Sequence, residues 1–164
     1  MKLGEILSQE DNARPLVGHD VEFWIKKGNK QRFLVKAKMY PLGEADRQQA
    51  KRDAMKHLRT LPDYKEVDRD GVPYLPPIPE AVRAAEEEYK RICAILHDVD
   101  DPSAKFVLNT DYAAFRSGVI AEQINRLADE YDAYIKNEYP ELMSAEQRAQ
   151  LEAEAQSKSQ GAHT

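Results

Sequence analysis

The chain has 164 residues, a net charge of −5 and a mean hydropathy of −0.72, a length typical of one domain with a limited apolar core. No run approaches the roughly 18 apolar residues of a membrane-spanning helix, and the single cysteine excludes an internal disulfide, which favours a cytosolic setting. The charge is split: residues 21–59 carry eleven basic and four acidic side chains, a net +7, whereas residues 60–164 carry a net −10.

Residues 1–20 give a weak structural signal. Leu3, Ile6 and Leu7 could share one face of a helix, but Pro15 and Gly18 interrupt the chain soon afterwards. We therefore expect a short helix or a flexible arm. The mixed, acidic start lacks the basic-then-apolar pattern of a signal peptide.

Residues 21–40 have the clearest strand pattern. Two runs of alternating apolar and polar residues flank Gly28-Asn29, a pair that tolerates the positive φ of a tight turn. The pattern predicts an antiparallel β-hairpin with one apolar face, on which Phe33 is expected to be a core residue, and one face rich in lysine and arginine.

Residues 44–59 are predicted to form a helix that packs lightly on this hairpin through a thin stripe, Ala45, Gln48, Met55 and Leu58. The following segment, 60–79, holds five prolines and is expected to be a connector. It either separates two subdomains or lies across the surface of the core, and we favour the second. Within it, Asp70-Gly71 is typical of a turn and would allow a short second hairpin.

Two strong amphipathic helices are predicted at 79–97 and 111–138, the second divided near Gly118 and ended by Pro140. Ser144 to Gln147 resembles a capping box that opens a last, solvated helix fraying into a disordered tail over 146–164. The sequence thus predicts an α+β fold, in which one domain over 21–145 has a small antiparallel sheet covered by three to four helices.

No motif in the chain indicates an enzyme. The four histidines are widely separated, and Cys93 lies on a predicted apolar helix stripe, as core cysteines do. Residues 66–71 resemble the start of a calcium loop, but the twelfth position is Pro77 instead of the required glutamate. We expect no catalytic residue, no cofactor and no metal site.

The basic block offers one binding hypothesis, because cations beside aromatic residues such as Trp24, Phe33 and Tyr40 can bind nucleic acid. We favour the alternative, in which the block pairs with acidic helices of this chain or of a neighbouring copy, as a face for self-association or partner docking. The candidate basic patch comprises Lys26, Lys27, Arg32, Lys36, Lys38, Lys51 and Arg52.

The apolar stripes of the two strong helices offer a second hypothesis, a groove that binds a partner helix. The candidate residues are Val82, Tyr89, Ile92 and Leu96 on the first helix, and Ile120, Ile124, Leu127 and Tyr131 on the second. In the alternative interpretation, which we favour for most of this surface, the stripes pack together as the core and leave only the helix edges to a partner.

Four segments are distinctive in this order of elements: residues 33–44, the aspartate-rich loop 98–101, the helix 115–134 and Tyr139-Pro140-Glu141. Together with the order of elements, they resemble the tail assembly chaperones of long-tailed bacteriophages. The resemblance implies a non-catalytic protein of the host cytoplasm that keeps the tape-measure protein soluble and recruits tail-tube subunits. It also implies that the loose end from Gln150 could adjoin a frameshift junction. A nucleic-acid-binding protein and a structural virion component are the alternatives.

Overall fold

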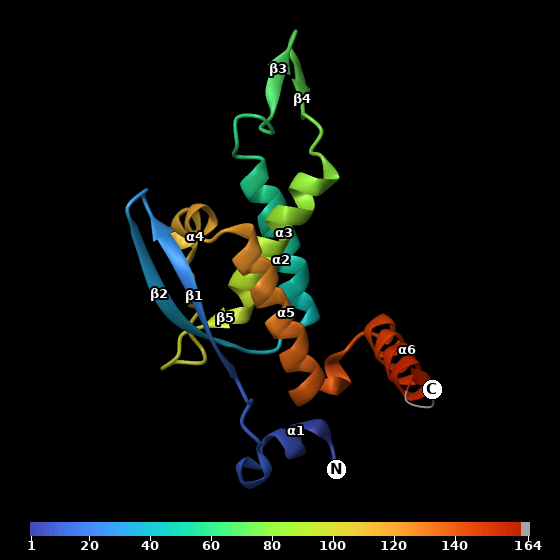
Figure 1. Ribbon diagram of the computed structural model, residues 1–164. Helices are drawn as coiled ribbons and strands as arrows, with labels where there is room; N and C mark the ends of the chain where they lie inside the picture. The colour runs from blue at the N-terminus through green and yellow to red at the C-terminus, as the bar shows by residue number, and fades with distance from the viewer. Residues whose placement is uncertain (162–164) are drawn as a thin grey trace.

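The computed structural model describes residues 1–161 and confirms the α+β class. Its main sheet has the order β1-β2-β5, where β1 is His19–Lys27, β2 is Gln31–Met39 and β5 is Leu96–His97, and all pairs are antiparallel (Figure 1). The core lies between one face of this sheet and the helices that follow. Its sheet residues are Val21, Phe23, Ala37 and Met39, and its helix residues include Tyr89, Ile92, Phe115, Ile124 and Leu127.

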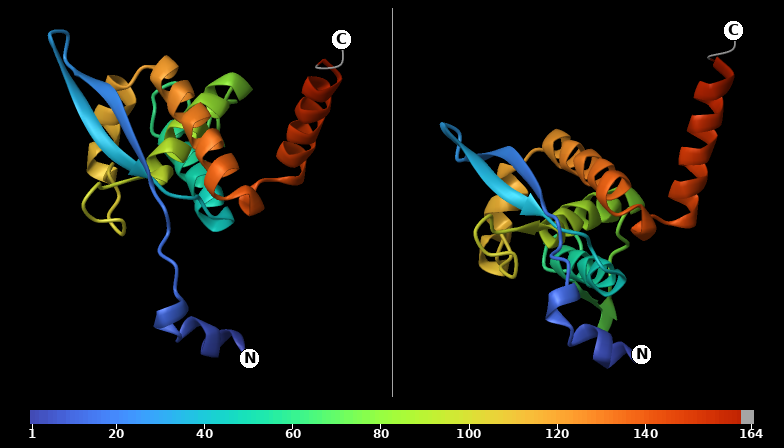
Figure 2. Two further views of the ribbon diagram at one scale, coloured as in Figure 1. Left: turned by 60° about the horizontal axis from the view of Figure 1, so that its bottom comes forward. Right: turned by 90° about the horizontal axis from the view of Figure 1, so that it is seen from below.

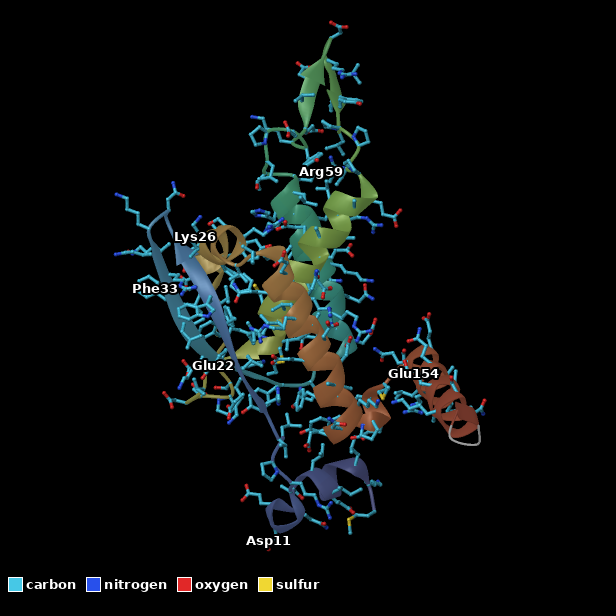
Figure 3. All side chains as sticks on the ribbon, in the orientation of Figure 1. Asp11, Glu22, Lys26, Phe33, Arg59 and Glu154 are labelled. Atoms are coloured by element: carbon cyan, nitrogen blue, oxygen red, sulfur yellow. The ribbon has the colours of Figure 1, made fainter. Side chains whose placement is uncertain are left out.

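The hairpin formed by β1 and β2 has the predicted turn, in which Gly28 adopts a φ of +64°. Phe23 pairs with Val35 and Ile25 with Phe33, so these side chains share the inner face. The prediction that Phe33 is a core residue is wrong, because its side chain is 49% exposed. The hairpin extends past the helices that cover it, so the inner face near the tip reaches solvent (Figure 3).

Helix α2, Glu44–Leu58, has the predicted bounds but packs against α3, Glu80–Ile95, instead of the hairpin. Its buried residues are Ala50, Ala54 and Leu58, whereas Met55 of the predicted stripe is exposed. The sequence pattern was misleading because small alanines, which carry little hydropathy, form the face that approaches α3.

The proline-rich segment forms the outer end of the α2–α3 pair, so the expectation that it lies across the core is wrong (Figure 1). It contains the second hairpin, β3 (Val67–Arg69) with β4 (Val72–Tyr74), turned by Asp70 and Gly71 at positive φ. At its base, the Arg59 guanidinium donates hydrogen bonds to the carbonyls of Tyr64, at 2.9 Å, and Pro76, at 2.6 Å.

The predicted helix break at Gly118 is confirmed: η2 (Asn109–Asp111) leads into α4, Tyr112–Gly118, and α5 follows as Ala121–Glu138. A Cβ atom on Gly118 would lie 2.6 Å from the carbonyl oxygen of Lys26, so the close approach of α4 to β1 requires glycine. Ile120, between the two helices, is 54% exposed.

Both ends of the chain project from the body (Figure 2). The N-terminal arm contains α1 (Leu3–Leu7) and η1 (Glu10–Asn12), so the short-helix prediction is confirmed. After η3 (Pro140–Leu142), the predicted capping box forms: Gln147 N–H donates to Ser144 Oγ, and Ser144 N–H donates to Gln147 Oε1. Helix α6 then runs over Ala145–Gly161, and the rest of the predicted tail, 162–164, lies outside the described residues.

Across residues 1–161, every helix is too short or too polar to cross a lipid bilayer.

Candidate functional site

The two apolar stripes form the core, as the favoured interpretation predicted, and not an open groove for a partner helix. Their inward residues are at most 5% exposed and therefore unavailable to another chain: Tyr89, Ile92, Leu96, Ile124, Leu127 and Tyr131. Val82 is half-buried and Ile120 is exposed, so these two alone could contact a partner. The stripes close the core because the sheet and α3, α4 and α5 share a single apolar interior.

The predicted basic patch is divided between two elements. Lys26, Lys27 and Arg32 gather at the tip of the β1–β2 hairpin, where Figure 3 labels Lys26. Farther along the hairpin, Lys36 and Lys38 lie 3.7 Å from Glu22 and Asp20, respectively. Lys51 and Arg52 belong to α2, which packs on α3 away from the hairpin. The hairpin tip is therefore one cluster of cations, and Lys51 with Arg52 on α2 is another.

The solvent face of the hairpin combines this charge with apolar surface. Trp24 and Leu34 are opposite each other in the strand register and are 40% and 47% exposed. The Arg32 guanidinium lies 4.4 Å from the centre of the Trp24 ring, which orders the indole. The arrangement is suited to contact with a partner that is both acidic and apolar.

A second candidate surface is the groove between the body and α6, with a volume of about 240 Å³. We call it the α6 groove. Its apolar residues come from the loop before α2, from α5, from η3 and its C-cap, and from α6: Leu42, Tyr131, Ile135, Leu142, Met143 and Leu151. Its charged residues include Arg47, Arg91 and Lys136, and on the acidic side Asp132 and Glu154.

The floor of the α6 groove is part of the core, and its wall is not. Tyr131 is buried and its hydroxyl accepts a hydrogen bond from Leu42 N–H at 2.9 Å, which fixes α5 against the loop before α2. The wall, α6, stands away from the body (Figure 2), and within its described side chains only Leu151 is even half-buried. The groove is thus closed on one side by a helix that contributes little to the core.

The most unusual buried group is Glu86 on α3, which is only 2% exposed. Its carboxylate accepts hydrogen bonds from the Tyr112 hydroxyl and from Arg116 Nε at 2.8 Å, and His57 Nε2 lies 3.6 Å away. Burial has the largest effect on the Tyr112 hydroxyl and raises its pKa, and the hydrogen bond to Glu86 raises that pKa further. At Arg116, burial disfavours the charged guanidinium, but the interaction with the Glu86 carboxylate outweighs burial and raises the pKa overall.

The Glu86 cluster joins α2, α3 and α4 around a buried carboxylate whose partners are all side chains of this chain, so we regard it as structural. Sequence reasoning missed it, although a signal was present. Glu86 lies three residues before Tyr89 and four after Val82, on the apolar face of its helix, where an acid needs a partner.

Cys93 is buried as predicted, and burial raises the pKa of its thiol to about 12, so it is a poor nucleophile. Over the residues that the structure describes, no group of three or more histidine, cysteine, aspartate or glutamate side chains is placed to hold a metal ion. The region 66–71 that resembles a calcium loop comprises strand β3 and the turn of the β3–β4 hairpin.

Comparison of the chain with protein-family models, with curated proteins and with solved structures found no match.

Proposed function

We propose that the protein is a non-catalytic assembly chaperone of the host cytoplasm that holds an amphipathic helix of a partner in the α6 groove. The observation that carries the proposal is the groove itself, an apolar floor on α5 faced by the detached helix α6. From the resemblance of the sequence to phage tail assembly chaperones, the partner is the tape-measure protein, and tail-tube subunits are recruited to the complex.

The physical argument depends on the size of the core. Among the described residues, the main apolar core lies between the sheet and three helices, and its side chains are already in contact with one another. A client must therefore bind apolar residues outside this core. A helix placed in the α6 groove would contact Leu142, Met143 and Leu151, which otherwise face solvent in part. The surrounding charges, Arg47 and Glu154 among them, would keep the complex soluble.

The test is co-expression with the tape-measure protein of the same genome, scored as the soluble fraction of that protein. We expect the wild-type chain to increase the soluble fraction several-fold. Leu151→Glu should abolish the increase, because it places a carboxylate in the apolar part of the groove.

The matched control is Ala153→Glu, which adds the same charge on the opposite face of α6, where residue 153 is exposed. It should solubilise the client as well as the wild type does. Equal activity of both variants would exclude the α6 groove as the client site, and an insoluble client with the wild-type chain would refute the chaperone proposal altogether.

The alternatives have less support. Nucleic-acid binding by the whole 21–59 block loses its main argument because Lys51 and Arg52 are not beside the hairpin tip, although that tip itself stays basic. A structural virion protein would be present in purified particles, whereas an assembly chaperone would be absent from them.

A further inference from the structure

The outer edge of β1 is closed by side chains of α5. The Gln123 amide donates to the Trp24 carbonyl and accepts from Trp24 N–H, both at 2.6 Å, as a neighbouring strand would. Arg126 Nη2 donates to the Glu22 carbonyl at 2.7 Å. The even-numbered residues of β1 therefore direct their backbone groups away from β2, and α5 pairs with them.

The opposite edge of the sheet, on β2, is covered only at one end. Tyr40 N–H donates to the Ile95 carbonyl at 3.3 Å, and Lys38 pairs with His97, so the even-numbered residues of β2 direct their backbone groups toward β5. Strand β5 ends there. Within residues 1–161, no hydrogen bond reaches the outward backbone groups of Arg32, Leu34 and Lys36.

We propose that this open edge, Arg32 to Lys36, binds an extended acidic segment of a partner protein, which joins the sheet as an additional strand beside β2. Main-chain hydrogen bonds would supply the affinity, as in other strand-addition complexes. The site is separate from the α6 groove, and the inference does not depend on the proposed function.

The side chains of the edge specify the chemistry of the partner. Arg32 and Lys36 are on the solvent face on either side of Leu34, while Phe33 and Val35 are on the inner face. Directly opposed residues in neighbouring strands contact each other. A matching segment therefore has acids at its first and fifth positions and three apolar residues between them, and this symmetric pattern fits both strand directions.

The same charges exclude a second copy of this edge. Two β2 strands paired antiparallel about Leu34 would set Arg32 opposite Lys36, and an in-register parallel pair would set Arg32 opposite Arg32. Like charges in direct opposition disfavour both arrangements, as lysines on exposed edges commonly do. The two cations thus select an acidic partner over self-association.

The test measures binding of the full-length protein to a fluorescein-labelled peptide, SEVLVES, by fluorescence anisotropy. Saturable binding is expected, with the peptide SKVLVKS at least tenfold weaker. Amide NMR shifts should be largest at Arg32, Leu34 and Lys36. Absence of binding, or equal binding of the two peptides, would overturn the proposal.

Two protein variants, with a third as a control, separate the contribution of the backbone from that of the charge. Leu34→Pro removes an N–H that points away from β1 and is not part of the pairing between β1 and β2. It should weaken peptide binding at least tenfold and leave the circular dichroism spectrum unchanged. Arg32→Glu should weaken SEVLVES and strengthen SKVLVKS, whereas Lys51→Glu on α2, with the same change of charge, should alter neither. If Arg32→Glu and Lys51→Glu act alike, only net charge matters and the proposed edge site is refuted.

Two further measurements test whether another ligand or another site explains the binding of SEVLVES. A ten-nucleotide single-stranded DNA that displaces SEVLVES at 150 mM salt would assign the hairpin to nucleic acid and overturn the proposal. Leu151→Glu, which tests the α6 groove, should bind SEVLVES as the wild type does. Failure of the chaperone proposal and failure of this inference are thereby distinguishable.

Discussion

Glu86 shows how much one side chain contributes to the arrangement of the helices. Its carboxylate is buried on α3 and contacts Tyr112 and Arg116 of α4 as well as His57 of α2. The Arg116 guanidinium also lies 3.9 Å from the centre of the Tyr89 ring. A buried acid is tolerated only because these donors replace its hydration, so each partner depends on the others.

Glu86→Ala should destabilise the fold by about 2 to 3 kcal/mol, because it leaves Arg116 and the Tyr112 hydroxyl without their acceptor. Urea unfolding followed by circular dichroism measures the change. The control is Glu87→Ala, whose partly exposed ion pair with Arg83 at 3.4 Å should contribute less than about 1 kcal/mol. Equal effects of the two substitutions would show that the buried cluster has no special role.

At the scale of elements, the position of the hairpin depends on the contact between α4 and β1. Helix α4 ends at Gly118 against the Lys26 carbonyl, and Ile25 Cγ1 lies 2.7 Å from the place of a Cβ atom. The Gln123 amide, in the first turn of α5, then pairs with Trp24. The α4–α5 corner therefore holds the strand that carries the exposed Trp24.

Gly118→Ala should lower stability by about 1 to 3 kcal/mol, because the methyl group would overlap the backbone of β1 and force the hairpin outward. Thermal unfolding measures the loss, and a weaker Gln123–Trp24 contact should increase the solvent quenching of Trp24 fluorescence. Gly4→Ala, in open space on α1, should leave the melting temperature unchanged. A Gly118→Ala protein as stable as wild type would mean that the corner is not closely packed.

The elements that the sequence predicted correctly depend on local signals. The Gly28 turn, the break at Gly118 and the Ser144 capping box each follow from the conformational preferences of a few neighbouring residues. The errors concern which surfaces meet. The exposure of Phe33 and the alanine face of α2 depend on contacts between distant parts of the chain, which hydropathy alone cannot specify.

The candidate surfaces were predictable only in part. The hairpin cations were identified, but their separation from Lys51 depends on the packing of α2 on α3. The α6 groove was not predicted, since it is formed by residues from Leu42 to Glu154 that only the fold brings together. The open edge of β2 was also missed, because it results from how short β5 is.

The whole molecule is a small closed core with projections: the N-terminal arm, the β3–β4 hairpin and α6 (Figures 1 and 2). Apolar residues of the arm, such as Leu3 and Leu7, are exposed, and the far hairpin exposes Val72. The net charge of −5 is the sum of −2 over residues 1–20, +7 over residues 21–59, which contain the hairpin tip and α2, and −10 over residues 60–164. Stability should therefore reside in the core, and binding in two surfaces at its margin, the α6 groove and the open edge of β2.

A chain that ends at Ser144 tests this separation directly. It lacks α6, whose described side chains are exposed apart from the half-buried Leu151, so its stability should fall by less than about 1 kcal/mol and its melting temperature by about 2 to 4 °C. A chain that ends at Glu138 also loses Tyr139 and Met143, which pack against the core, together with the hydrogen bond between Tyr139 and Val17. Calorimetry should show a clearly larger loss for this second chain.

The same pair of chains connects the fold to the proposed activity. Because the Ser144 chain retains the core and lacks one wall of the α6 groove, it should fold normally and fail to solubilise the client, while it still binds SEVLVES at β2. Cooperative unfolding near the wild-type temperature with full client solubility would place the client elsewhere. A melting temperature more than about 10 °C lower would instead make α6 part of the stable fold.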